Sequence, residues 1–194
     1  MLEQDFLSIK NKLEPKQGRF LISDPFSKDS FFSRAVVLLT SYSKEGSTGF
    51  ILNKPIDAKI SDLITEFDNF EANLSLGGPV STDSIFFIHK LGNIIPDSHH
   101  IFDKFYWGGD IKVIRKKIKG FEIHPNQMRF FIGYSGWSSQ QLEEELKNNY
   151  WIVVDKVPQN FMTNFNPNMW NKLLLSLGER FSVWANLPKS PNLN

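Results

Sequence analysis

An early hairpin of two strands decides the fold class of this chain. Residues 34–41 read RAVVLLTS, an apolar and β-branched run typical of a buried strand, and residues 48–53 read TGFILN, a second strand. Between them the residues SKEG (43–46) are typical of a turn. Pro55 ends the second strand, because proline has no N–H to donate to a neighbouring strand. The hairpin favours an α+β fold with a mixed sheet over a regular doubly wound fold.

Strands and helices alternate irregularly through the rest of the chain. Further strands are predicted at residues 19–23, 84–90, 128–134 and 150–155, and helices at 60–67, 110–119, 138–149 and 166–178. Asp110 is the expected N-cap of its helix, which Gly120 ends. Apolar residues at helical spacing also predict a helix at 2–13, which Pro15 ends. We expect an N-terminal amphipathic helix extension (1–16), a single α+β domain (17–185) and a polar flexible tail (186–194).

Composition excludes several classes of protein. A length of 194 residues fits one domain, and a net charge of +1 argues against a protein that coats nucleic acid. The absence of cysteine excludes disulfides, thiolate catalysis and cysteine-ligated metals. No apolar run approaches the roughly 20 residues that span a bilayer, and the first residues lack the basic start of a signal peptide. We therefore expect a cytoplasmic protein with no membrane partner.

The stretch GYSGWSSQQLE (residues 133–143) is the place to look for a serine nucleophile. The Gly-x-Ser-x-Gly pattern of a nucleophile elbow fails at Trp137, and all four histidines precede Ser135, whereas that fold needs the histidine after the serine. The structural interpretation is a strand that ends at Gly133, followed by a helix with Ser138 as its cap and Gln141 three residues on. No catalytic residue is assigned.

No motif for a phosphate, dinucleotide or metal occurs. The stretch LGGPV (residues 76–80) is interpreted as a sharp turn where backbones pack closely. His99 and His100 point in opposite directions on an extended chain, so they rarely reach one ion. An anion at the start of the 138–149 helix is an alternative, opposed by the charges of Glu143–Glu145. We expect no metal and no cofactor.

The one basic cluster lies on the helix predicted at 110–119. A solvated helix face explains it, because the isoleucines between the basic residues would face the core. Contact with nucleic acid is the alternative, but neither a nearby aromatic stacking platform nor a recognition helix supports it, so direct binding is not expected. The cluster comprises Lys112, Arg115, Lys116, Lys117 and Lys119.

Three segments in order resemble the AlgH/YqgE family of bacterial proteins. They are residues 24–55, which begin DPF and end GFILNKP, then LGGPV (76–80), then 133–145 with GYSGW and QLE. The resemblance covers residues 17–184 and implies an α+β fold in which a bifurcated mixed sheet curls into a small barrel surrounded by helices. It also implies a cytosolic protein, and some members are labelled transcriptional regulators. One departure is Gln140, where the family usually has glycine before Gln-Leu-Glu.

The leading hypothesis is a non-enzymatic regulatory or interaction protein that binds a protein partner where three bends of these segments, around positions 53, 78 and 136, meet. Trp137 is either the anchor of that surface or a core tryptophan. The alternative is a small-ligand-binding protein or an enzyme that uses the same cleft, with Ser135 and Asn53 as polar contacts and His89 as a base. The residues expected to line the cleft are Asn53, Gly77, Gly78, Pro79, Ser135, Gly136, Trp137 and Gln141.

Overall fold

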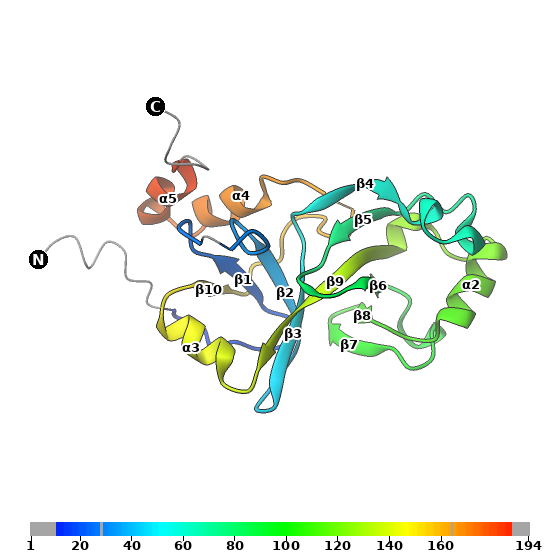
Figure 1. The fold of residues 1–194 in the computed structure, drawn as a ribbon, viewed down its shortest axis with the longest axis horizontal. Helices are drawn as coiled ribbons and strands as arrows, with labels where there is room; N and C mark the ends of the chain where they lie inside the picture. Colours follow the sequence, from blue (N-terminus) through cyan, green and yellow to red (C-terminus); the bar gives the residue numbers. More distant parts are fainter. Residues whose placement is uncertain (1–10, 28, 164, 188–194) are drawn as a thin grey trace, which may run out of the picture.

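One long strand, β9 (Met128–Ser138), joins the two lobes of the molecule in this computed structural model (Figure 1). The structure describes residues 11–27, 29–163 and 165–187. The first lobe is an antiparallel sheet in the order β10-β1-β2-β3-β9. Its other strands are β1 (Phe20–Ser23), β2 (Val36–Ser43), β3 (Gly46–Ile51) and β10 (Trp151–Val154).

The second lobe continues the sheet from the other edge of β9 in the order β9-β6-β8-β7. Strand β5 pairs with β9 in parallel and carries β4 on its outer side. The strands of this lobe are β4 (Pro55–Lys59), β5 (Asn73–Leu76), β6 (Val80–His89), β7 (His99–Phe102) and β8 (Phe105–Trp107). The sheet is therefore mixed, as predicted.

The sheet forks along one edge of β9. Strand β3 pairs with residues 135–138 of that edge and β5 with residues 130–132. Between the two stretches lies Gly133, whose φ of +66° lets the strand turn. The predicted barrel is wrong, because the sheet is open, with β10 and β7 at the ends of its strand order. A barrel needs each strand to continue round to the next, whereas here β3 and β5 share one edge and the sheet branches.

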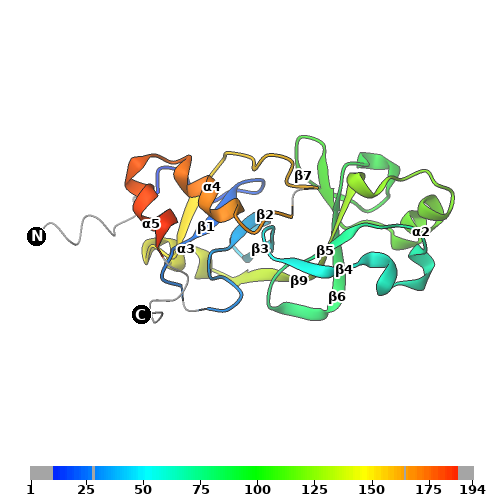
Figure 2. The ribbon, with the colours of Figure 1, turned by 90° about the horizontal axis from the view of Figure 1, so that it is seen from above.

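The helices are distributed unevenly over the two lobes (Figures 1 and 2). The first lobe carries α3 (Gln141–Lys147), α4 (Met169–Leu175) and α5 (Ser182–Asn186), and α2 (Ile111–Lys119) lies at the far end of the second. The short 3-10 turns are η1 (Ile60–Asp62), η2 (Thr65–Phe67), η3 (Gly92–Ile94), η4 (Pro125–Gln127) and η5 (Glu179–Phe181).

Apolar side chains gather in three clusters. The first packs α4 and α5 on one face of the first lobe, centred on Trp170 and Leu38. The second fills the other lobe beneath α2, with Ile114 and Ile118 of the helix against Phe130 of β9. The third includes Leu142 of α3. The burial of the apolar surface of these clusters is the main favourable contribution to folding.

Several predicted elements are confirmed, including the β2–β3 hairpin and helix α2. Asp110 caps α2, accepting a hydrogen bond from the Lys112 N–H at 2.8 Å. The helix predicted at 60–67 is instead the two turns η1 and η2. Helix α3 begins at Gln141 and not at Ser138, because β9 extends through Ser138.

Four short strands were missed. Strand β4 begins at Pro55, a permitted first residue for a strand with a free edge, and β5 was not predicted. Strands β7 and β8 lie within residues 91–109, whose turn signals hid them. Short strands without clear alternation depend on their neighbours for stability, so local pattern detects them poorly.

The two chain ends are only partly described. Most of the helix predicted at 2–13 lies outside the described residues, and residues 11–13 are not helical. The Asn11 amide instead binds the outer edge of β10, donating to the Trp151 carbonyl at 2.9 Å and accepting from the Val153 N–H at 2.8 Å. Of the predicted tail, residue 186 belongs to α5, and 188–194 lie outside the described residues.

Candidate functional site

The three bends of the proposed surface do meet, at the fork of the sheet. The Gly77 N–H donates to the Ile132 carbonyl at 2.8 Å. The Gly77 carbonyl accepts from the Ile51 N–H at 2.9 Å and from the Ser135 hydroxyl at 3.0 Å. Gly77 of the second bend is thus hydrogen-bonded both to strand β3 and to strand β9. Sequence-distant segments converge here as predicted.

This junction is buried and offers no open cleft at Ser135. The Ser135 side chain is 0% exposed, and Gly77 and Gly78 are also buried, whereas Pro79 is exposed. A Cβ atom at Gly78 would fall inside contact distance of the Tyr134 carbonyl and the Ser135 nitrogen. The glycines therefore let three backbones approach closely. Their role in this arrangement is to hold the fork together.

Asn53 stabilises the turn beside this junction by hydrogen bonds to the backbone. Its side-chain oxygen accepts from the Val36 N–H and its amide donates to the Arg34 carbonyl, both at 2.8 Å. It lines a separate cavity of about 310 Å³ together with Lys54 and Asn171. Asn53 and Ser135 therefore do not face one shared pocket.

Trp137 belongs to a tryptophan pair held by one carboxylate. Its indole is 5% exposed and donates to Glu145 Oε2 at 2.8 Å, while the Trp151 indole donates to the same oxygen at 2.6 Å. The Gln141 amide donates to Glu145 Oε1 at 2.9 Å. Phe32 stacks on Trp137 with ring centroids 6.1 Å apart. Trp137 is thus a core tryptophan that positions Glu145.

A groove of about 530 Å³ opens beside this cluster, between α3, the start of β10 and the segment that follows β1. Phe26 and Tyr150 remain 57% and 53% exposed. Exposed aromatic rings beside a cavity are typical of interaction sites. We call this cavity the α3 groove; it is lined by Ser23, Asp24, Phe26, Ser27, Asp29, Phe32, Gln141, Glu145, Tyr150 and Trp151.

Three carboxylates line the α3 groove, and none of the described residues that line it is basic. Asp24 accepts from the Phe26 N–H at 2.7 Å, yet burial raises the pKa of its carboxyl above the ordinary value. Asp29 accepts from the N–H of Phe31 at 2.7 Å and is attracted to Lys54 in the neighbouring cavity. Each carboxylate retains acceptor capacity for a cation.

Of the eight residues predicted to line one cleft, only Gln141 lines the α3 groove. Gly136 and Trp137 line a shallow surface hollow on the β3 side. The segments that carry the family resemblance did contain groove residues, within DPF (24–26) and the QLE helix. The local sequence there indicates only a turn and a solvated helix face, because it is tertiary packing that brings these residues together. The groove residues missed are Ser23, Asp24, Phe26, Ser27, Asp29, Phe32, Glu145, Tyr150 and Trp151.

His89 has a structural role far from Ser135. It pairs across the sheet with Met128, seven residues before Ser135 on β9, a separation of about 23 Å at the usual strand rise. Its Nδ1 accepts from the Leu91 N–H at 3.2 Å, and Nε2 lies 3.1 Å from the Gly108 carbonyl. The ring is fully buried. His89 therefore does not act as a base on Ser135.

The buried ring predicts acid sensitivity. Burial lowers the pKa of His89 below 6.5, so the unfolded chain binds this proton at a higher pH than the folded one. The stabilisation is complete above about pH 6.5 and is lost as pH falls through the lowered pKa. Urea unfolding between pH 7.5 and 5 should show this loss in the wild type and a flatter profile in His89→Asn. Exposed His100→Asn is the control, and equal slopes in all three proteins would contradict the assignment.

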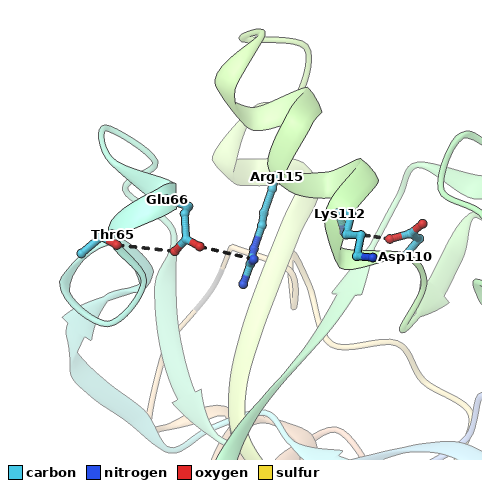
Figure 3. A network of polar contacts seen from close by, with 5 residues as sticks. All are labelled: Thr65, Glu66, Asp110, Lys112 and Arg115. Atoms are coloured by element: carbon cyan, nitrogen blue, oxygen red, sulfur yellow. Dashed lines mark hydrogen bonds and ion pairs between the residues drawn. The ribbon is translucent and has the colours of Figure 1, made fainter.

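The basic helix α2 is partly neutralised along its sides. Arg115 pairs with Glu66 of η2 at 3.3 Å, and Glu66 lies beside Thr65 (Figure 3). Lys117 pairs with Glu122 at 2.7 Å. Exposed ion pairs of this kind contribute little stability. The remaining lysines of the helix are exposed.

The departure at Gln140 has a conformational cost. Gln140 is the N-cap of α3 with φ of +64°, the left-handed region that favours glycine, and its side chain makes no capping bond. Gln140→Gly should therefore stabilise the fold by about 0.5–1 kcal/mol in urea unfolding. Gln140→Ala keeps the strain and should show no comparable gain. A loss of stability in the glycine variant would contradict this account.

Two features are absent from residues 11–27, 29–163 and 165–187. No helix there is both long and apolar enough to cross a bilayer. No group of three or more His, Asp or Glu side chains is placed to hold a metal ion.

Comparison with known proteins gives consistent matches along nearly the whole chain. A family model described as AlgH-like matches residues 20–182. The UPF0301 protein of Parabacteroides distasonis is 40% identical, covering 95% of this chain and 94% of its own length. The UPF0301 protein of Cytophaga hutchinsonii is 41% identical, covering 92% and 98%.

Two solved structures share the fold. Protein DIP2367 from Corynebacterium diphtheriae superposes with a TM-score of 0.76 at 19% identity, covering 96% of this chain and 100% of that one. AlgH from Pseudomonas aeruginosa superposes with a TM-score of 0.70 at 22% identity, covering 93% and 98%. At such identities the likeness concerns the fold alone.

Proposed function

This chain belongs to the AlgH-like family, and we propose that it is a non-enzymatic regulatory protein of the cytoplasm that binds a segment of a partner protein. The domain of residues 17–185 would present the α3 groove to that segment. The observation that carries the proposal is a cavity of about 530 Å³ with two exposed aromatic rings and three carboxylates along its walls.

The chemistry of the groove selects the kind of segment. Exposed Phe26 and Tyr150 supply large contact areas at low entropic cost. The carboxylates Asp24, Asp29 and Glu145 favour a cation and disfavour an anion. The fitting partner segment is therefore one that carries lysine or arginine beside an aromatic or aliphatic side chain.

The base of the groove is rigid, which favours binding. Glu145 accepts from the indoles of Trp137 and Trp151 and from the Gln141 amide, so its side chain is held in one position. Phe32 meets Trp151 edge-on with ring centroids 5.4 Å apart. A preformed site loses less conformational entropy when the partner binds.

The enzymatic alternative lacks comparable support. Ser135 is buried and donates its hydroxyl to the Gly77 carbonyl. His89 lies at the other end of β9 and Asn53 in a different cavity. The polar groups of that hypothesis do not converge on one point, as nucleophilic or acid–base catalysis requires.

The test uses two short synthetic peptides that differ only in charge. One alternates lysine with phenylalanine, the other glutamate with phenylalanine, and both are titrated by fluorescence anisotropy. We expect the lysine peptide to bind at least about tenfold more tightly, and Tyr150→Ala to weaken it about fivefold or more.

Leu63→Ala is the matched control, because Leu63 is 52% exposed but lies in the other lobe, on the loop between η1 and η2. It should leave binding unchanged. Equal affinity for the two peptides, or no effect of Tyr150→Ala, would overturn the proposal.

A further inference from the structure

Three lysines of α2 form an unpaired basic stripe. Lys112, Lys116 and Lys119 are exposed, and no ion pair reaches them within the described part of the chain. At 3.6 residues per turn they lie on the helix face opposite Ile114 and Ile118, which are buried. Arg115 points to Glu66 at one side of the stripe (Figure 3).

An aromatic side chain follows the helix in an unusual conformation. Phe121 is 82% exposed and has φ of +56°. Its N–H donates to the Ile118 carbonyl at 3.0 Å, and the Glu122 N–H donates to the Lys117 carbonyl at 2.9 Å, the pattern in which the left-handed residue is usually glycine. A bulky residue there costs stability, and its ring remains in solvent, which is typical of a contact site.

The stripe and Phe121 together, called the α2 patch, complement the α3 groove. The patch has exposed cations and one aromatic ring; the groove has carboxylates and an aromatic cavity. Helix α2, which carries the patch, lies at the far end of the second lobe, and α3, which borders the groove, lies on the first lobe (Figures 1 and 2). Surfaces this far apart cannot meet within one molecule.

We propose that the partner segment of the α3 groove is the α2 patch of a second copy of this chain. The inference rests on the proposed function, because it uses the same groove. Phe121 of one copy inserts beside Phe26 and Tyr150 of the next. The stripe lysines of the first copy then face Asp24 and Asp29 of the second. Such a contact joins two different surfaces, so a pair of copies still has one free groove on one member and one free patch on the other, and larger assemblies form as concentration rises.

Sedimentation velocity over a series from micromolar to millimolar concentrations tests the proposal. We expect the average sedimentation coefficient to rise with concentration at about 50 mM salt and much less at about 500 mM, because salt screens exposed charges. Phe121→Asn should keep the fold, since asparagine tolerates the left-handed region, and should abolish association.

A charge-matched pair of variants tests the stripe. Lys112→Gln with Lys116→Gln removes two unpaired charges and should weaken association about fivefold or more. Arg115→Gln with Lys117→Gln removes two charges that already have partners, and should weaken it much less. Equal effects of the two double variants would overturn the role of the stripe.

Mixing two defective variants gives the sharpest result. Phe121→Asn keeps the groove and Tyr150→Ala keeps the patch, so each alone should stay monomeric while the mixture forms a one-to-one complex. A monomeric wild type at all concentrations, or a mixture with no complex, would overturn the inference.

The outcomes separate this inference from the proposed function. If the lysine peptide binds the groove but the chain does not associate, the groove has another partner and only the self-association fails. If the lysine peptide does not bind and the chain does not self-associate, both the proposed function and this inference fail. Binding of a single-stranded oligonucleotide that Phe121→Asn abolishes, without self-association, would assign the α2 patch to nucleic acid and overturn the inference.

Discussion

Gly78→Ala is expected to abolish folding or to destabilise the protein by more than about 3 kcal/mol. The added Cβ would overlap the Tyr134 carbonyl and the Ser135 nitrogen, which are backbone atoms of the fork and have no free space to move into. Relief would require Gly78 to separate from β9. The free energy of unfolding in urea, or the yield of soluble protein if the variant does not fold, measures the effect.

Gly120→Ala is the control for this prediction. Gly120 has φ of −80°, and its nearest neighbour is the flexible Glu122 carboxylate at 3.1 Å, so alanine fits with a change of about 0.5 kcal/mol or less. If Gly78→Ala were as stable as Gly120→Ala, the close backbone approach at the fork would be refuted.

Arg129→Ala is the second substitution with a large expected effect, a loss of about 3–5 kcal/mol. The guanidinium is fully buried and donates to the carbonyls of Leu52 and Phe161 and to the Ser75 hydroxyl at 2.9 Å. It also lies 4.4 Å from the Phe165 ring centroid. Alanine would leave a cavity and remove the donors of buried acceptors.

One effect opposes this loss. Burial lowers the pKa of Arg129 to about 9, so the charged group is disfavoured inside, although it remains protonated at pH 7. The hydrogen bonds outweigh this cost of burying the charge, because one planar group donates to acceptors from three separate segments. Arg129→Lys keeps the charge without the fork-shaped donors, and should recover less than half of the loss. Full recovery by lysine would show that charge and not geometry matters here.

Local sequence patterns were sufficient to predict the strongly periodic elements. The apolar runs of β2 and β10, and the Asp110 cap with the Ile114 and Ile118 stripe of α2, depend on residues close in sequence. Their burial follows from periodicity alone. The short strands β4, β5, β7 and β8 depend on pairing with distant segments, and no local signal predicted them.

The convergence of the three bends was predicted through resemblance, but the character of the place where they meet was not. Ser135 and Gly77 carry residue types common in active sites, yet here their polar atoms bond to each other. The side chains left exposed are Phe26 and Tyr150, which sequence alone does not distinguish from core aromatics. Burial is a property of the packed chain, and composition does not report it.

The amino-acid sequence by itself determined the α+β class, the β2–β3 hairpin, the α2 helix and the family. Each follows from hydrophobic spacing, turn residues or motif order within short stretches. The family resemblance already implied a bifurcated sheet, but only the tertiary structure decided that this sheet stays open, that Trp137 is buried against Glu145, and that Asp24 and Glu145 border one groove. The pairing of β3 and β5 with β9 and the meeting of Asp24 with Glu145 join segments that are distant in the sequence. Trp137 and Glu145 are close in the sequence, but the burial of that indole depends on Phe32 and Trp151, which other segments supply when the chain packs about β9.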